Sequence, residues 1–138
     1  MDEAITLSAV GIKANTNLYQ LKMEFTGGVH SEVVNVMQGA SLDPKMVPIE
    51  TKKAIAAVEV YVRDNEEGDS NIYGLRLLDS GFMQVHVQIW RRSSEAKWVR
   101  IAVPDGMKII GFHGTHDQNY IKQLGMVLWK PNPYAGAD

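Results

Sequence analysis

Apolar side chains recur at every second position along most of this chain. Val58, Val60 and Val62 alternate with other residues, and the same alternation marks Val85–Ile89 and Val99–Val103. A period of two is typical of β-strands that bury one face. Glycine, proline and aspartate punctuate the runs at intervals of about 8 to 12 residues, as in sandwiches, barrels and prisms. The pattern therefore predicts an all-β domain of short antiparallel strands.

One segment has a helical alternative. Between Pro48 and Val62, the residues Ile49, Ile55 and Val58 could share one face of a helix. The run Val58–Val62 is too β-branched and too regular in its alternation for a helix, so we predict a strand there. The preceding residues Glu50–Lys53 are expected to form a short helical or irregular connection.

An internal repeat organises these strands into three units. Leu18, Ile72 and Ile121 each begin a strand with further apolar residues at the third and fifth positions after them. The residue at the third position breaks the alternation, which predicts either a β-bulge or an exchange of faces in that strand of each unit. Units this small cannot bury a face alone, so we expect their inner faces to meet around a common axis. The three copies pair Ala9–Ile12 with Asn17–Met23, Ala57–Val60 with Asn71–Leu77, and Ile109–Phe112 with Asn119–Met126.

Composition narrows the functional classes. With 138 residues, 45% of them hydrophobic, the chain suits one domain, which we place at 1–131 with a tail at 132–138. A net charge of −2 gives no electrostatic reason to expect nucleic acid as a partner. No apolar run approaches the roughly 18 residues that span a bilayer, so the chain is not expected to be membrane-embedded. The acidic N-terminus and the absence of cysteine favour a cytoplasmic location, with secretion after processing left open.

Signals for catalysis or metal binding are weak. His113 and His116 are three residues apart on a predicted strand and loop, where side chains point to different sides. No nucleophile elbow or phosphate-binding loop is present. The acidic run Arg63–Asn71 has oxygen ligands for Ca²⁺ but not the spacing of an EF-hand, and a solvated hairpin tip explains it. We therefore predict no enzymatic activity, no cofactor and no metal site.

The segment from Met107 to Pro131 carries a specific resemblance. It contains Lys108-Ile109-Ile110-Gly111-Phe112-His113-Gly114, a short polar loop, then Leu124-Gly125 and a closing proline. Gly111 and Gly114 stand where a side chain would obstruct a bulge or a close backbone approach. The segment resembles the closing hairpin of the jacalin-related lectins, which often reads K-I-V-G-F-H-G before a short loop. This resemblance implies a β-prism I fold of three four-stranded antiparallel Greek-key sheets with pseudo-threefold symmetry.

A second threefold architecture stays open. The tripeptide Gln88-Ile89-Trp90 matches the Q-x-W often seen in β-trefoil lectins, although it occurs once in this chain. The β-trefoil is therefore the alternative to the β-prism.

The resemblance also indicates a binding loop. In sugar-binding jacalin-related lectins the final loop carries G-x-x-x-D, which here falls on Gln118 and Lys122. Lysine only donates hydrogen bonds and cannot replace the carboxylate as an acceptor. We expect Asp117 to supply the acceptor and Tyr120 to stack on a sugar ring. The candidate ligand-binding residues are His116, Asp117, Gln118, Asn119 and Tyr120.

Two functions follow from this interpretation. The first is a non-enzymatic, lectin-like carbohydrate-binding module that uses its apical loops. The alternative is a β-prism that has lost sugar binding and serves as a protein–protein interaction or structural subunit. The partner would be a glycan in the first case and a protein in the second, and homo-oligomers or larger assemblies are compatible with both.

Overall fold

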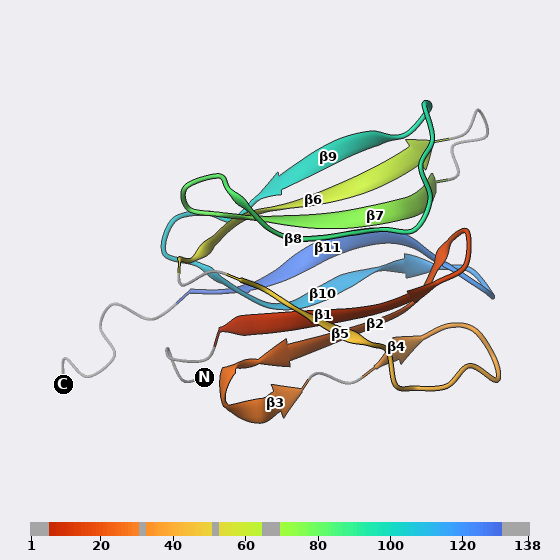
Figure 1. The fold of residues 1–138 in the computed structure, drawn as a ribbon, viewed down its shortest axis with the longest axis horizontal. Helices are drawn as coiled ribbons and strands as arrows, with labels where there is room; N and C mark the ends of the chain where they lie inside the picture. Colours follow the sequence, from red (N-terminus) through yellow and green to blue (C-terminus); the bar gives the residue numbers. More distant parts are fainter. Residues whose placement is uncertain (1–5, 31–32, 51–52, 65–69, 131–138) are drawn as a thin grey trace.

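The computed structural model describes residues 6–30, 33–50, 53–64 and 70–130. These residues form antiparallel β-strands, and their one helical segment is the 3₁₀ turn η1 at Thr26–Gly28 (Figure 1). The predicted all-β class is confirmed. No helix in the described ranges has the length and apolar character needed to cross a membrane. The strands are β1 (Leu7–Ala14), β2 (Leu18–Phe25), β3 (Val29–His30), β4 (Val34–Asn35), β5 (Met46–Pro48), β6 (Ile55–Asp64), β7 (Ser70–Asp79), β8 (Gln84–Ile89), β9 (Lys97–Ala102), β10 (Lys108–His116) and β11 (Ile121–Trp129).

The strands form three sheets (Figure 1). Sheet A has the order β3-β2-β1-β5, with β4 also paired to β2, and sheet B has the order β8-β7-β6-β9. In both sheets the last strand returns beside the first, which is the Greek-key arrangement. Sheet C contains β10 and β11 alone among the described residues. Two of the three sheets thus have a Greek-key order, but three four-stranded sheets are not confirmed, because sheet A includes a fifth strand and sheet C is a two-stranded hairpin in the described ranges.

The predicted bulges occur at the same register in all three hairpins. In each hairpin the ladder shifts just after an apolar residue at or near the start of the second strand, Leu18, Ile72 or Ile121. This shift lets that residue and the apolar residues at its third and fifth positions face the same side. The pairs on either side of the shift are Ala14↔Leu18 and Lys13↔Gln20, Val62↔Ile72 and Tyr61↔Gly74, and His116↔Ile121 and Thr115↔Gln123.

The register also corrects one part of the predicted repeat. Gly111–Gly114, and not Ile109–Phe112, pairs as Ala9–Ile12 and Ala57–Val60 do. The sequence alignment of this strand was therefore wrong by two residues. A shift of two keeps every side chain on its own face, so the apolar pattern cannot detect it.

Parts of the predicted connections and the tail lie outside the described ranges. The short strand β4 at Val34–Asn35 lies within them. The connection at 51–52, the acidic tip at 65–69 and the tail at 132–138 lie outside the described residues.

Side chains from all three hairpins meet in one core. Leu18 and Leu77 are completely buried, and burial of such a side chain stabilises the fold by about 1.5–3 kcal/mol. The strands β2, β7 and β11 contact one another, so the second strands of the hairpins surround the centre. The core residues are Leu7, Val10, Leu18, Leu21, Met23, Phe25, Val58, Val60, Ile72, Leu75, Leu77, Val103, Ile109 and Ile121.

The outer face of sheet B carries a buried charge. Glu59 accepts hydrogen bonds from Arg76 at 2.7 Å and from Arg100 at 3.0 Å. Burial acts to raise the pKa of Glu59, but the hydrogen bonds from the two guanidinium groups outweigh it and lower the pKa below 4.5. Arg76 also lies 4.1 Å above the ring of Trp98, which adds a cation–π contact. The network fixes three neighbouring strands, β6, β7 and β9, side by side.

His86 makes stability depend on pH. The side chain is 4% exposed on β8, and burial lowers the pKa of its imidazole below 6.5. The His86 imidazole therefore binds a proton more readily in the unfolded chain than in the folded protein. Stability should fall as the pH drops below about 6.5 and level off below the pKa of the folded state.

Urea unfolding of the wild-type chain at several pH values between about 5 and about 8 measures this effect. The His86→Gln variant should show a smaller loss on the acid side, whereas the exposed loop variant His116→Gln should behave like the wild type. Equal acid loss in His86→Gln and wild type would show that another group is responsible.

Candidate functional site

The candidate site lies at the tip of the β10–β11 hairpin. The ladders of β1–β2, β6–β7 and β10–β11 all end on the same side of the molecule (Figure 1). A hydrogen bond joins two of these hairpins, because Lys122 Nζ donates to Asn71 Oδ1 at 3.1 Å. The loop predicted to bind ligand is thus anchored to sheet B.

Asp117 organises this loop. Its Oδ1 accepts hydrogen bonds from the backbone N–H groups of Asn119 and Tyr120, each at 2.8 Å. The Asp117 N–H in turn donates to the Tyr120 carbonyl at 3.0 Å. Such an Asx turn fixes both the loop backbone and the direction of the carboxylate. The second oxygen, Oδ2, lies 3.6 Å from Lys122 Nζ, and the side chain is 50% exposed.

These contacts stabilise the negative charge of Asp117. The backbone amides of Asn119 and Tyr120, followed by Lys122, lower the pKa of the carboxyl group below 3.8. The group is therefore ionised at neutral pH. An ionised carboxylate accepts hydrogen bonds only, whereas the adjacent ammonium of Lys122 only donates.

The structure places the other predicted residues as follows. Gln118 and Asn119 are exposed, and Tyr120 is half-buried directly before β11. His116 is exposed, and its Nδ1 lies 2.8 Å from the Asp117 carbonyl oxygen, a contact that requires the proton on Nδ1. Asp117 and Tyr120 come together through the backbone. The structure therefore groups the five predicted residues in one small polar loop.

Two members of the site were missed at the sequence level. Lys122 was considered only as a lost aspartate, whereas it connects Asp117 to Asn71. Asn71 was not considered for the site. The repeat contained the signal, since Asn71 directly precedes Ile72, the counterpart of Ile121 in the second unit.

Glycine shapes the hairpin that carries the loop. A Cβ at Gly114 would overlap the carbonyl oxygen of Gln123 on the facing strand. The ring of His113 covers Gly125, where a Cβ would lie 2.7 Å from Nε2. The close backbone approach expected at Gly114 is confirmed. At Gly111 there is no close approach, because the nearest atom to an added Cβ would be Val127 Cβ at 3.6 Å, but the ladder shifts between Ile109 and Gly111 as expected of a bulge.

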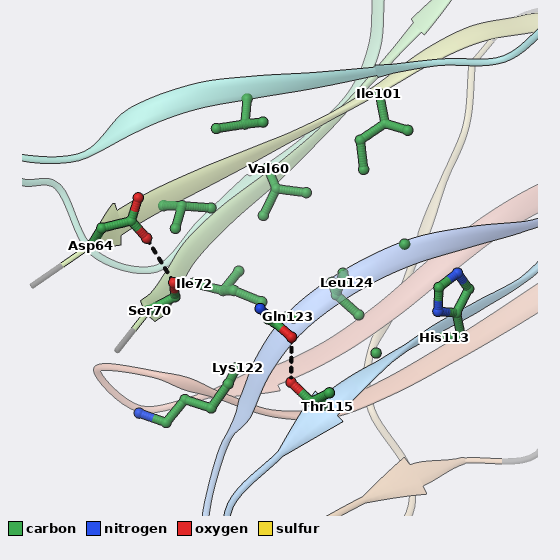
Figure 2. A pocket seen from close by; sticks show the side chains of 14 residues that line it. Val60, Asp64, Ser70, Ile72, Ile101, His113, Thr115, Lys122, Gln123 and Leu124 are labelled. Atoms are coloured by element: carbon green, nitrogen blue, oxygen red, sulfur yellow. Dashed lines mark hydrogen bonds between the residues drawn. The ribbon is translucent and has the colours of Figure 1, made fainter. Parts of the chain in front are cut away.

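Cavities lie on both sides of the hairpin. One, of about 550 Å³, lies between β10–β11 and sheet B, and Figure 2 shows Val60 and Ile101 pointing into it opposite Leu124. The other, of about 260 Å³, lies toward sheet A and is lined by Leu21 and Val34. The hairpin is thus less tightly covered along its sides than β1–β2 or β6–β7, which have a strand on each side.

No protein-family model matches this sequence, and no curated protein matches it. Within the described ranges, no three histidine, aspartate or glutamate side chains gather closely enough to hold a metal ion.

The two glycines of β10 give a matched test of the hairpin geometry. Gly114→Ala should destabilise the protein by at least about 2 kcal/mol, because its methyl group overlaps a backbone atom that can move only with the strand. Gly111→Ala should change the free energy of unfolding by less than about 1 kcal/mol, since its methyl group meets only ordinary contacts. Chemical denaturation of both variants measures the difference, and equal stabilities would contradict the geometry.

Proposed function

We propose that this protein is a non-enzymatic, lectin-like module with a β-prism fold that binds carbohydrate through the β10–β11 loop. Three hairpins with a common register, two Greek-key sheets and a centre made by β2, β7 and β11 support the prism. The resemblance of Met107–Pro131 to jacalin-related lectins points to the same loop.

The observation that carries the proposal is the fixed carboxylate of Asp117. Sugar hydroxyls both donate and accept hydrogen bonds, so they bind best to acceptors and donors held side by side. Oδ2 of Asp117 offers the acceptor on a half-exposed side chain, and Lys122 Nζ lies 3.6 Å away. Because two backbone amides already orient the carboxylate, a sugar would not have to order it.

This arrangement moves the acceptor within the loop. In the family pattern the carboxylate stands at the position of Lys122, and here Asp117 provides it from the start of the loop. The amide side chains of Gln118 and Asn119 lie on the exposed side of the same turn. With so few polar contacts on one loop, the expected Kd for a monosaccharide is about 1 mM or weaker.

A glycan array followed by NMR titration with the best monosaccharide tests the proposal. Asp117→Asn keeps an oxygen for the two backbone amides but removes the charge, so the loop should persist while affinity falls about tenfold. The control is Asp105→Asn, in the exposed turn between β9 and β10, which should bind like the wild type. A blank array, or equal affinities for Asp117→Asn and wild type, would reject the loop as a sugar site.

A further inference from the structure

Sheet C differs from the other sheets at its edges. In sheet B, β6 pairs with β9 and β7 pairs with β8, and sheet A has strands on both sides of β1–β2. Among the residues that the structure describes, β10 and β11 pair only with each other. The outer backbone N–H and C=O groups of such an edge can form a ladder with another strand.

The larger cavity follows the edge of β11. Leu124 and its neighbours Gln123 and Gly125 all line it, although successive residues of a strand point to opposite faces. The cavity therefore reaches around the edge of the strand and is not confined to one face. Across from β11 it is lined by Val99 and Ile101 of sheet B, and Val99 is 42% exposed.

In sheet B, β8 pairs with the second strand of the hairpin, β7, and so occupies the position that a strand next to β11 would have in sheet C. On β7, the residues Gly74–Leu78 pair with β8, from Gly74↔Ile89 to Leu78↔Gln84. The common hairpin register makes Gln123–Val127 of β11 the counterpart of Gly74–Leu78. A strand of about five residues, antiparallel to β11, would therefore complete this side of sheet C.

The contacts of β8 also indicate what such a strand would cover. β8 lies against sheet A, because Gln88 Nε2 donates to the Val10 carbonyl at 3.2 Å and Glu50 N–H donates to the Val85 carbonyl at 3.2 Å. The strand next to the second strand of one hairpin thus packs on the neighbouring sheet. Applied to sheet C, this rule places the added strand against sheet B at Val99 and Ile101.

We propose that the edge of β11 at Gln123–Val127 binds an extended segment of a partner protein by strand addition. The segment runs antiparallel to β11, as β8 does to β7. Its side chains opposite Leu124 and Met126 face Val99 and Ile101, so they are apolar and alternate with exposed residues. The charged residues lining the cavity, Asp64 and Lys122, are of opposite sign, and Figure 2 shows both away from Ile101, which favours an uncharged segment.

Selection from a random heptapeptide library displayed on phage, with the full chain as bait, tests this site. Enriched peptides should carry apolar residues at alternate positions. Their binding should protect alternate amides of Gln123–Val127 from hydrogen exchange in the unsubstituted chain. No enrichment, or protection elsewhere only, would overturn the proposal.

Two exposed valines of sheet B supply the matched variants. Val99→Asp places a charge in the cavity and should weaken peptide binding at least about tenfold, whereas Val87→Asp on the outer face should leave it unchanged. Asp117→Asn should also leave it unchanged, which separates this site from the proposed sugar loop. Equal binding by Val99→Asp and wild type would overturn the proposal.

Light scattering and hydrogen exchange of the free protein exclude other occupants. A dimer that dissociates in Val99→Asp would identify a second copy as the occupant and reject the partner segment. Protection of the Gln123–Val127 amides in the free monomer would show that the chain covers its own edge. A monomer with fast exchange at these amides supports strand addition by a partner.

Discussion

The mutual burial of three hairpin faces is the interaction on which this structure depends. A two-stranded hairpin is at best marginally stable in water, and none of the three could hide its apolar face alone. Leu18, Ile72 and Ile121 occupy the same place in their hairpins, and all three are at most 5% exposed. The bulge beside each of them brings the inner residues to one side. The ends of the three hairpin ladders therefore lie on the same side of the molecule.

Polar contacts then hold the strands of sheet B together and join sheet C to sheet B. Glu59 connects β6 to its neighbours through Arg76 and Arg100, and the Lys122–Asn71 hydrogen bond connects sheet C to sheet B. Such contacts add little net stability, because desolvation offsets much of the attraction. They leave few alternative arrangements for the strands that they join. The loop at Asp117 is held in place by the same kind of contact.

The sequence was sufficient for features that depend on local pattern. The apolar residues at the third and fifth positions after Leu18, Ile72 and Ile121 predicted three hairpins with a bulge or an exchange of faces, and the structure has a shift of register in each. The register of the third copy was harder to predict, because a shift of two residues leaves every side chain on the same face of the strand. That is why Ile109–Phe112 was paired in place of Gly111–Gly114.

Contacts between residues far apart in the sequence could not be predicted. The turn around Asp117 is local, and a carboxylate beside two loop amides follows from ordinary turn chemistry. The contact between Lys122 and Asn71 joins different hairpins, so neither residue alone indicates it. The burial of His86, which is 4% exposed, could not be predicted either, because its strand shows only an alternation of apolar and other residues. The segments that form each hairpin were thus predictable, apart from the two-residue error in the third one, whereas the packing between sheets was not.

The shared register has a consequence for protein engineering. The ladders of the three hairpins match residue by residue, although their connecting loops differ in length. Loop length is therefore decoupled from strand alignment in this architecture. Segments of foreign sequence grafted between Ala14 and Leu18, or between His116 and Ile121, would inherit a rigid support, making the molecule a scaffold for displaying designed recognition loops.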